Sequence, residues 1–241
     1  MNGPTNPWSG LPRQAEDYVL QADRALIDQH NRGRGARNPQ SYIHLNLLPE
    51  PFVGQHDASV VLLFLNPGFS PQDAVFHGDP SFSAALRSNL NHAPSAYPFY
   101  LLDPNLTVPG IGLSPGYGWW RPRLRELIEA CGVDGQRRVA NNLLCVELFG
   151  YHSKSCEYPI PVVPSQQYSF HLVRQALARD AIILVRTGRW FEAIPELRDK
   201  PNVYYRHHAR PAHVTPNNYG QGFWRAVDRI KVTPVLPPFS N

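Results

Sequence analysis

One apolar segment most constrains how this chain can fold. Residues 60–65 are six consecutive apolar residues, with two β-branched valines first, which is typical of a strand buried on both faces of a parallel sheet. The segment runs directly into Asn66-Pro67-Gly68. Pro67 favours an extended Asn66, and Gly68 permits a sharp turn. The sequence therefore predicts a polar side chain at the carboxyl edge of the sheet, where open α/β sheets bind ligands, although Asn is also common in ordinary turns.

Length and composition limit the class of protein. A chain of 241 residues with 42% hydrophobic residues is long enough for one sizeable α/β domain. The net charge of +4 permits a polyanionic partner without requiring one. No apolar segment approaches the roughly 18 residues of a membrane span, the polar amino-terminal segment has no signal-peptide core, and the three cysteines form no Cys-x-x-Cys pair. We therefore expect a cytoplasmic, monomeric protein with reduced thiols and no membrane contact.

The apolar spacing predicts strands that alternate with helices. Segments with helical spacing are residues 14–31, 81–90, 119–131, 165–179 and 223–230. Buried strands are expected at residues 60–65, 137–149, 181–185 and 203–205. A half-buried strand at residues 41–48 and a loop at 49–57 complete an amino-terminal extension. This order favours a single three-layer α-β-α domain, residues 1–241, around a central, mostly parallel four-stranded sheet.

A long connection separates the first buried strand from the next helix. Residues 70–116 are rich in Pro, Ser, Asn and aromatic residues and show little regular pattern apart from a short helix. A connection of this length is usually functional or disordered, and its aromatic density argues against disorder. We expect it to form a lid or pocket wall, with a packed surface loop as the alternative.

Four motifs occur in the order of a known family. They are Leu65-Asn66-Pro67-Gly68, Trp119-Trp120-Arg121-Pro122-Arg123-Leu124, Asn141-Asn142-Leu143-Leu144, and His208-Ala209-Arg210-Pro211 followed by Tyr219-Gly220-Gln221-Gly222-Phe223-Trp224. Together they resemble the uracil-DNA glycosylase superfamily, and most closely its mismatch-specific uracil/thymine branch. The match covers about residues 58–231, with residues 14–48 as an extension and residues 70–116 as an insertion.

The resemblance implies a uracil-DNA glycosylase-like fold and a monofunctional DNA glycosylase, which hydrolyses an N-glycosidic bond and leaves an abasic site. Such an enzyme flips the base out of the DNA stack and recognises its edge and its face. It also needs a held water on the sugar side and a hydrogen-bond donor aimed at the departing base. DNA is then the expected partner, and no cofactor is expected.

The resemblance assigns the catalytic roles to Asn66 and His208. The Asn66 amide can orient a water, although it cannot act as a true base. His208 would donate to the departing base, with His207 as the alternative. A solvated loop is another interpretation of these histidines, and with His213 they could hold zinc. Nothing else in the sequence completes a ligand set, so we expect no metal.

The second strand and the aromatic residues would bind the base. The resemblance places Asn142 against the Watson–Crick edge, with Asn141 as the alternative, because only one of two adjacent strand residues faces the site. The two asparagines could instead cap local backbone. Stacking would come from Phe69 or Phe76, with Phe82 in reserve. Pro67 and Gly68 would line the same site.

DNA contacts are expected from polar and basic residues near the same sheet edge. The candidates are Ser153, Lys154, Ser155, Arg186, Arg189, Arg206 and Arg210. Hydroxyls, arginines and helix starts are groups that bind phosphates, and a solvated basic surface is the alternative. Arg210 lies where the family places a residue that enters the duplex.

The sequence also departs from the family. It lacks the Asp and Tyr of the first branch's opening motif and the cysteines of the iron–sulfur branches. The insertion of residues 70–116 is longer than that of the mismatch-specific branch, which favours a base bulkier than uracil. A modified or hypermodified cytosine of phage DNA, removed in antiviral defence, is one such substrate. Carboxylates that could assist the water are Asp73, Asp79, Asp103 and Glu147.

Two other classes of function remain as alternatives. One is a binding module on the same fold that holds DNA or a flipped base without cutting it. The other is an unrelated α/β hydrolase or nucleotide-binding domain. The sequence contains neither the Gly-x-Ser-x-Gly elbow of such a hydrolase nor a P-loop.

Overall fold

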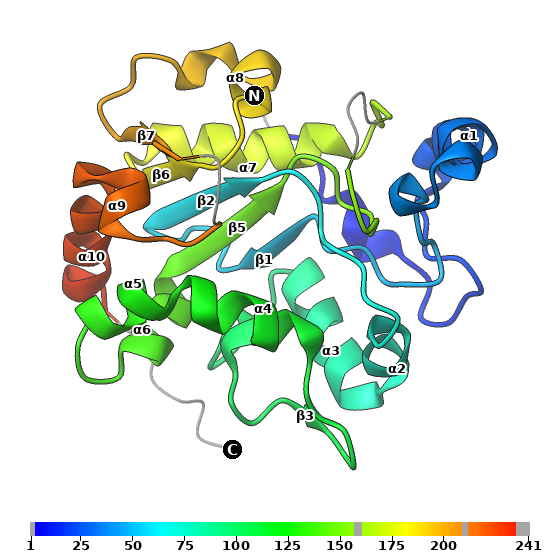
Figure 1. Ribbon diagram of the computed structural model, residues 1–241, viewed down its shortest axis with the longest axis horizontal. Coiled ribbons are helices and arrows are strands. Elements are labelled where there is room, and N and C mark those ends of the chain that lie inside the picture. The colour runs from blue at the N-terminus through cyan, green and yellow to red at the C-terminus, as the bar shows by residue number, and fades with distance from the viewer. Residues whose placement is uncertain (1–2, 157–160, 209–211, 235–241) are drawn as a thin grey trace.

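A mixed five-stranded sheet forms the centre of the computed structural model, which describes residues 3–156, 161–208 and 212–234 (Figure 1). Its strand order is β1-β5-β2-β6-β7. These strands are β1 (Phe52–Gly54), β5 (Leu143–Glu147), β2 (Val60–Phe64), β6 (Ile182–Val185) and β7 (Val203–Tyr205). The last four are parallel to one another, and β1 runs antiparallel to β5 at the edge. The prediction of a mostly parallel sheet is therefore confirmed.

Strand β2 lies at the middle of the sheet, as its continuous apolar sequence predicts. It pairs with β5 on one side and with β6 on the other, and all five of its residues are buried. In the parallel register Phe64 lies beside Glu147, so the carboxyl ends of β2 and β5 are level. Side chains that follow these two strands are brought to one edge of the sheet.

Helices cover both faces of the sheet (Figure 1). Helix α7 (Gln166–Ala178) packs on β5 and β6, while α3 (Pro80–Leu90), α6 (Gly135–Asn142) and α10 (Gln221–Val232) lie on the opposite face. The other helices are α1 (Gln21–His30), α2 (Asp73–Gly78), α4 (Pro115–Arg123), α5 (Arg125–Ala130), α8 (Arg189–Ala193) and α9 (Pro216–Tyr219). A small hairpin, β3 (Thr107–Val108) and β4 (Gly112–Leu113), lies within the insertion. Within the described parts of the chain, no helix could cross a membrane.

The sheet has one more strand than predicted. Strand β1 occupies part of residues 49–57, which the sequence predicts as a loop. A three-residue strand is too short to show the alternation of apolar and polar residues from which a strand is predicted. Phe52 and Val53 are nevertheless buried. The prediction of a strand at residues 41–48 is wrong. The β-structure of this segment is limited to an isolated bridge between His44 and His152. The first helix is also shorter than the predicted 14–31 and continues as a π-helical turn, Asn31–Gly35.

The predicted placement of Asn141 and Asn142 inside a strand is wrong. Both residues end helix α6, and β5 begins only at Leu143. Each side-chain amide bonds the carbonyl oxygen four residues earlier, at 3.0 Å in both cases, which is a helical arrangement. The apolar residues before Leu143 form the buried face of this short helix. As a result, Asn142 lies at the amino end of β5.

Gly54 ends β1 in a conformation that only glycine adopts readily. Its φ is +117°, and an added Cβ would overlap the carbonyl oxygen of Leu143 on the paired strand β5. We expect Gly54→Ala to destabilise the fold by more than about 2 kcal/mol, because both the backbone strain and the clash with a backbone atom must be relieved.

Gly118 provides the matched control for this substitution. It lies inside α4, and a Cβ there would have no neighbour within 4 Å. Gly118→Ala should stabilise the protein by up to about 1 kcal/mol through helix propensity. Urea unfolding of both variants measures the difference, and equal stabilities would contradict this account of β1.

Candidate active site at the carboxyl edge of the sheet

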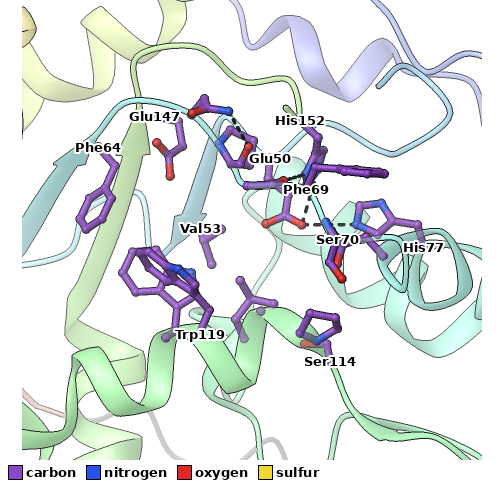
Figure 2. Close-up of a pocket in the computed structure, with 18 of the residues that line it drawn as sticks. Glu50, Val53, Phe64, Phe69, Ser70, His77, Ser114, Trp119, Glu147 and His152 are labelled. Carbon is purple, nitrogen blue, oxygen red and sulfur yellow. Dashed lines mark hydrogen bonds and ion pairs between the residues drawn. The ribbon is translucent and has the colours of Figure 1, made fainter. Parts of the chain in front are cut away.

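A cavity of about 400 Å³ opens where β2 and β5 end (Figure 2). Its volume lies within the range of about 300–1,000 Å³ typical of small-molecule sites. In Figure 2, Glu147, Phe64 and Trp119 stand on one side and Ser70 and His77 on the other. The residues that line it include Glu50, Phe64, Asn66, Pro67, Gly68, Phe69, Asp73, His77, Phe82, Trp119, Trp120, Glu147, His152, Lys154 and Arg186.

The insertion of residues 70–116 forms a wall of this cavity, as expected. It begins at Ser70 and continues through Asp73 and His77 of α2 and Phe82 of α3. Ser114, the residue before α4, lies on the lower side in Figure 2. The long connection is therefore folded against the sheet edge and bounds the space next to Asn66.

The Asn66 side chain is held in one orientation. Its Nδ2 donates to the carbonyl oxygen of Pro67 at 2.7 Å and to the carbonyl oxygen and Oγ of Ser153 at 3.2 and 3.0 Å. No described residue donates a hydrogen bond to Asn66 Oδ1. The amide oxygen is therefore left as an acceptor on a residue that lines the cavity. Ser153 is buried and its hydroxyl serves this anchor, which argues against the predicted phosphate contact.

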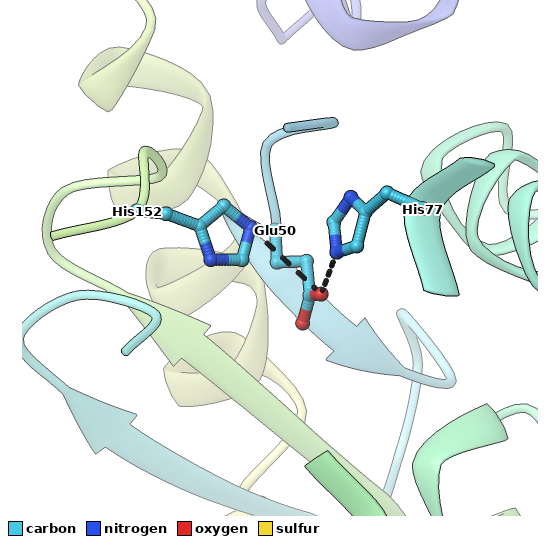
Figure 3. A group of neighbouring side chains, drawn as sticks. All are labelled: Glu50, His77 and His152. Carbon is cyan, nitrogen blue, oxygen red and sulfur yellow. Dashed lines mark ion pairs between the residues drawn. The ribbon is translucent and has the colours of Figure 1, made fainter. Parts of the chain in front are cut away.

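A buried group of three ionisable residues lies beside this turn (Figure 3). His77 Nε2 is 3.5 Å and His152 Nε2 is 3.9 Å from Glu50 Oε1. Burial alone would raise the pKa of Glu50, but the hydrogen bond from His77 and the charge of His152 hold that pKa below its ordinary value. Glu50 is therefore a carboxylate at neutral pH.

His152 connects this group to the turn that carries Asn66. Its Nδ1 lies 2.7 Å from the Gly68 carbonyl oxygen and its Nε2 lies 2.9 Å from the Leu48 carbonyl oxygen. Because both partners are acceptors, only the doubly protonated ring satisfies both. Burial is the larger effect and holds the pKa of His152 below its ordinary value, although the Glu50 carboxylate opposes that shift. His152 thus fixes the Gly68 end of the turn.

The three ligand atoms of Glu50, His77 and His152 lie within 4.8 Å of one another, a spacing that a metal ion could bridge. The hydrogen bonds do not fit that interpretation. His77 Nδ1 accepts the backbone N–H of Leu48 at 3.0 Å, so its Nε2 must carry the proton and has no lone pair to give. A metal-ligating histidine shows the reverse arrangement and donates from its other nitrogen. We interpret the group as a structural hydrogen-bonded cluster around the Glu50 carboxylate.

Glu147 is the polar side chain that β5 brings to the cavity. It is 6% exposed, its Oε1 accepts only the weak donor Cys145 Sγ at 3.7 Å, and its Oε2 has no partner among the described residues. Burial raises the pKa of Glu147 to about 8, against the opposing charge of Arg186. Near neutral pH the group is therefore a carboxylic acid, able to donate and to accept a hydrogen bond.

Aromatic rings line both sides of the cavity. Phe64, Trp119 and Trp120 pack together, with ring centroids 4.7 to 5.9 Å apart. On the other side, Phe69 stacks on His44 with centroids 3.5 Å apart and planes 2° apart. The remaining face of such a ring can stack on a flat ligand.

The structure brings together some of the predicted base-binding residues and separates others. Pro67, Gly68, Phe69 and the reserve candidate Phe82 line the cavity. Phe76 is buried against Phe82 in the core and does not reach it. Asn142 lies at the amino end of β5, roughly 16 Å from the carboxyl edge at about 3.3 Å per residue. The prediction that Asn142 contacts a base beside Asn66 is therefore wrong, because the two residues lie at opposite ends of their strands.

Of the predicted catalytic histidines and DNA-contact residues, some line the cavity and others lie outside it. Lys154 and Arg186 line the cavity. Arg189 lies outside it and pairs with Glu192 at 3.0 Å. His207 and His208 are exposed and outside the lining. Arg210 lies outside the described residues.

Sequence reasoning missed most of the buried polar residues of the site. Glu50 was placed in a connecting loop, and His77 was one of many residues in the insertion. A usable signal existed for His152, because it follows a buried strand just as Asn66 does. Ser153 and Glu147 are named from the sequence, but for other roles: Ser153 as a phosphate contact and Glu147 as a carboxylate that assists the water.

No family model, curated protein or solved structure matches this chain. Its function must therefore be inferred from the chemistry of the cavity.

The pKa of Glu147 predicts how stability depends on pH. An unfolded glutamic acid releases its proton near pH 4.5, whereas folded Glu147 keeps it until about pH 8. Between these values the folded state binds more protons, so this residue makes stability fall as pH rises. Urea unfolding at about pH 5 and about pH 8 should show a smaller loss for Glu147→Gln than for wild type. Parallel losses would contradict a protonated Glu147.

The hydrogen bonds of His77 predict the response to metals. Neither zinc nor a chelator should change the thermal unfolding midpoint, because no lone pair on His77 is available for a ligand bond. A saturable, one-to-one rise of the midpoint with zinc that disappears in Glu50→Gln would instead identify a metal centre. Exposed Glu129→Gln, on α5, is the control.

Proposed function

We propose that this protein is a DNA glycosylase that takes a flipped base into the cavity and hydrolyses its N-glycosidic bond. The observation that carries the proposal is the anchored Asn66 amide at the carboxyl end of β2. Its nitrogen is committed to Pro67 and Ser153, its oxygen accepts no hydrogen bond from any described residue, and the residue lines a cavity with aromatic walls. A fixed acceptor beside a flat, apolar space suits a water held against the sugar of a stacked base.

On the sugar side, Asn66 Oδ1 would accept a hydrogen bond from the attacking water. Because an amide cannot take the proton, a second group is needed. Asp73 lines the cavity, and the Ser70 backbone N–H holds its carboxylate at 2.6 Å. Burial raises the pKa of Asp73, which makes it a better proton acceptor. We assign it the water proton as the hydroxyl adds to the sugar carbon.

On the base side, Glu147 takes the role that the resemblance gave to His208. The bond between the sugar carbon and the base nitrogen breaks with its electron pair on the base. A carboxylic acid whose pKa is about 8 can give its proton to that base near neutral pH. The released base then leaves with the proton of Glu147, the water supplies the hydroxyl of the abasic sugar, and exchange with solvent restores both carboxyl groups.

The walls support a bulky base rather than plain uracil. The insertion builds one side of a cavity of about 400 Å³, and polar side chains, Glu50 and Lys154 among them, border it. These features favour a base that carries a polar substituent. We therefore retain a modified or hypermodified cytosine of phage DNA as the proposed substrate, with antiviral defence by a monomeric cytoplasmic enzyme as its setting.

Mass spectrometry of released bases tests the proposal. Uracil-containing DNA, mismatched DNA and phage DNA with modified cytosines would each be incubated with wild type and with Asn66→Ala. Wild type should release one base, and Asn66→Ala should release it at least about a hundredfold more slowly, the usual loss for a positioned catalytic group.

Asn91→Ala is the matched control, because Asn91 is exposed and its amide bonds only the Arg87 carbonyl oxygen within its own helix end. It should release the base at the wild-type rate. If wild type binds these DNAs but releases no base from any of them, the protein is a binding module and the glycosylase proposal fails.

A further inference from the structure

Two arginine side chains lie on the aromatic wall of the cavity. The Arg123 guanidinium is 4.0 Å from the centroid of the Trp119 ring, and that of Arg186 is 5.1 Å from the centroid of the Phe64 ring. These two rings are themselves in contact, with centroids 5.9 Å apart. One continuous aromatic surface therefore supports both guanidinium groups, and Trp119 and Arg186 line the cavity.

The buried nitrogen of each guanidinium group lacks a hydrogen-bond acceptor among the described residues. The Nε atoms of Arg123 and Arg186 are buried and bond to none of the described residues. Arg123 makes one side-chain hydrogen bond, from Nη1 to the Trp119 carbonyl oxygen at 2.7 Å. The Arg186 guanidinium makes none with any residue that the structure describes. Buried charged donors without acceptors are costly unless a ligand supplies them.

The surrounding charges do not neutralise this pair. Burial and the charge of Arg186 lower the pKa of Arg123, and burial and the charge of Arg206 lower that of Arg186. Glu147 is the carboxyl group that acts on Arg186, and it stays protonated until about pH 8. Arg206, at the end of β7, thus repels Arg186 at the end of β6, and Arg186 repels Arg123 on α4.

We propose that Arg123 and Arg186 together bind one backbone phosphate of DNA, next to the base that occupies the cavity. A phosphate offers several acceptor oxygens and a negative charge, and guanidinium groups bind it through paired N–H donors. Stacking on Trp119 and Phe64 fixes the two side chains in advance, so little flexibility is lost on binding. This inference rests on the proposed function for the identity of its ligand. The anion site itself is independent of catalysis.

Sulfate is the first probe, because its charge is constant near neutral pH. It should raise the unfolding midpoint of wild type in a saturable way, and Arg123→Gln and Arg186→Gln should each weaken the fitted affinity by about tenfold or more. Arg125→Gln is the control, since Arg125 lies exposed on α5, 4.0 Å from Glu129. Circular dichroism confirms that the variants fold. If folded Arg186→Gln responds to sulfate like wild type, the site does not exist.

The protonation of Glu147 gives a second readout. The titratable and charged groups that act on Arg186 are Arg206, Glu147, Tyr219 and Cys145. Burial raises the pKa of Tyr219 to about 12 and that of Cys145 far above its ordinary value, so Glu147 alone changes charge near pH 8. Sulfate affinity should fall above that pH in wild type and stay level in Glu147→Gln. The same fall in both proteins would contradict this arrangement.

DNA binding distinguishes the source of the phosphate. For an oligonucleotide, each arginine variant should lower the slope of log affinity against log salt by about one, the value for one lost phosphate contact. If a free 5′-mononucleotide binds more tightly than the oligonucleotide, the assignment to DNA backbone is overturned. If both arginines govern sulfate and DNA binding but no base is released, the inference stands and the proposed enzyme activity fails.

Discussion

The clamp on the Asn66-Pro67-Gly68 turn is the interaction on which the site depends. Two adjacent residues after β5 hold a turn that follows β2: His152 bonds the Gly68 carbonyl oxygen, and Ser153 accepts from the Asn66 amide. This is possible because β2 and β5 are parallel neighbours in register, so their following loops meet at one edge. The buried Glu50 carboxylate in turn supports His152. The geometry of one side chain thus depends on pairing between strands far apart in the sequence.

Burial divides the charges around the cavity into two groups. Glu50 keeps its charge because two histidines surround it, whereas Glu147 loses its charge because burial dominates. The carboxyl group nearest Arg186 is therefore neutral, and the arginines give this side of the cavity a positive potential. Such a potential favours a polyanion such as DNA, while the protonated Glu147 offers a proton close to the aromatic surface where a base would stack.

Local sequence patterns predicted the parts of the fold that local physics determines. Strand β2, the turn at Asn66 and helix α7 follow from continuous or periodic apolar residues, and the structure confirms them. The boundary between α6 and β5 was missed because the apolar residues from Val139 onward change period without a Gly or Pro to mark it. The Glu50 group could not be predicted, because its members come from three segments that only the folded sheet edge brings together. The prediction for Asn142 was wrong because this helix–strand boundary was not recognised. His152 was missed because its partners lie in distant segments of the sequence.

A crystal structure of Asn66→Ala with DNA that contains the released base would test the central claim most directly. Loss of the water anchor should leave the base uncut while the cavity and the arginines remain. The account predicts one nucleotide outside the duplex stack, with its base against the aromatic wall, its edge at Glu147 and its sugar next to position 66. DNA bound on another face, or along this edge with every base still stacked and the cavity empty, would contradict it.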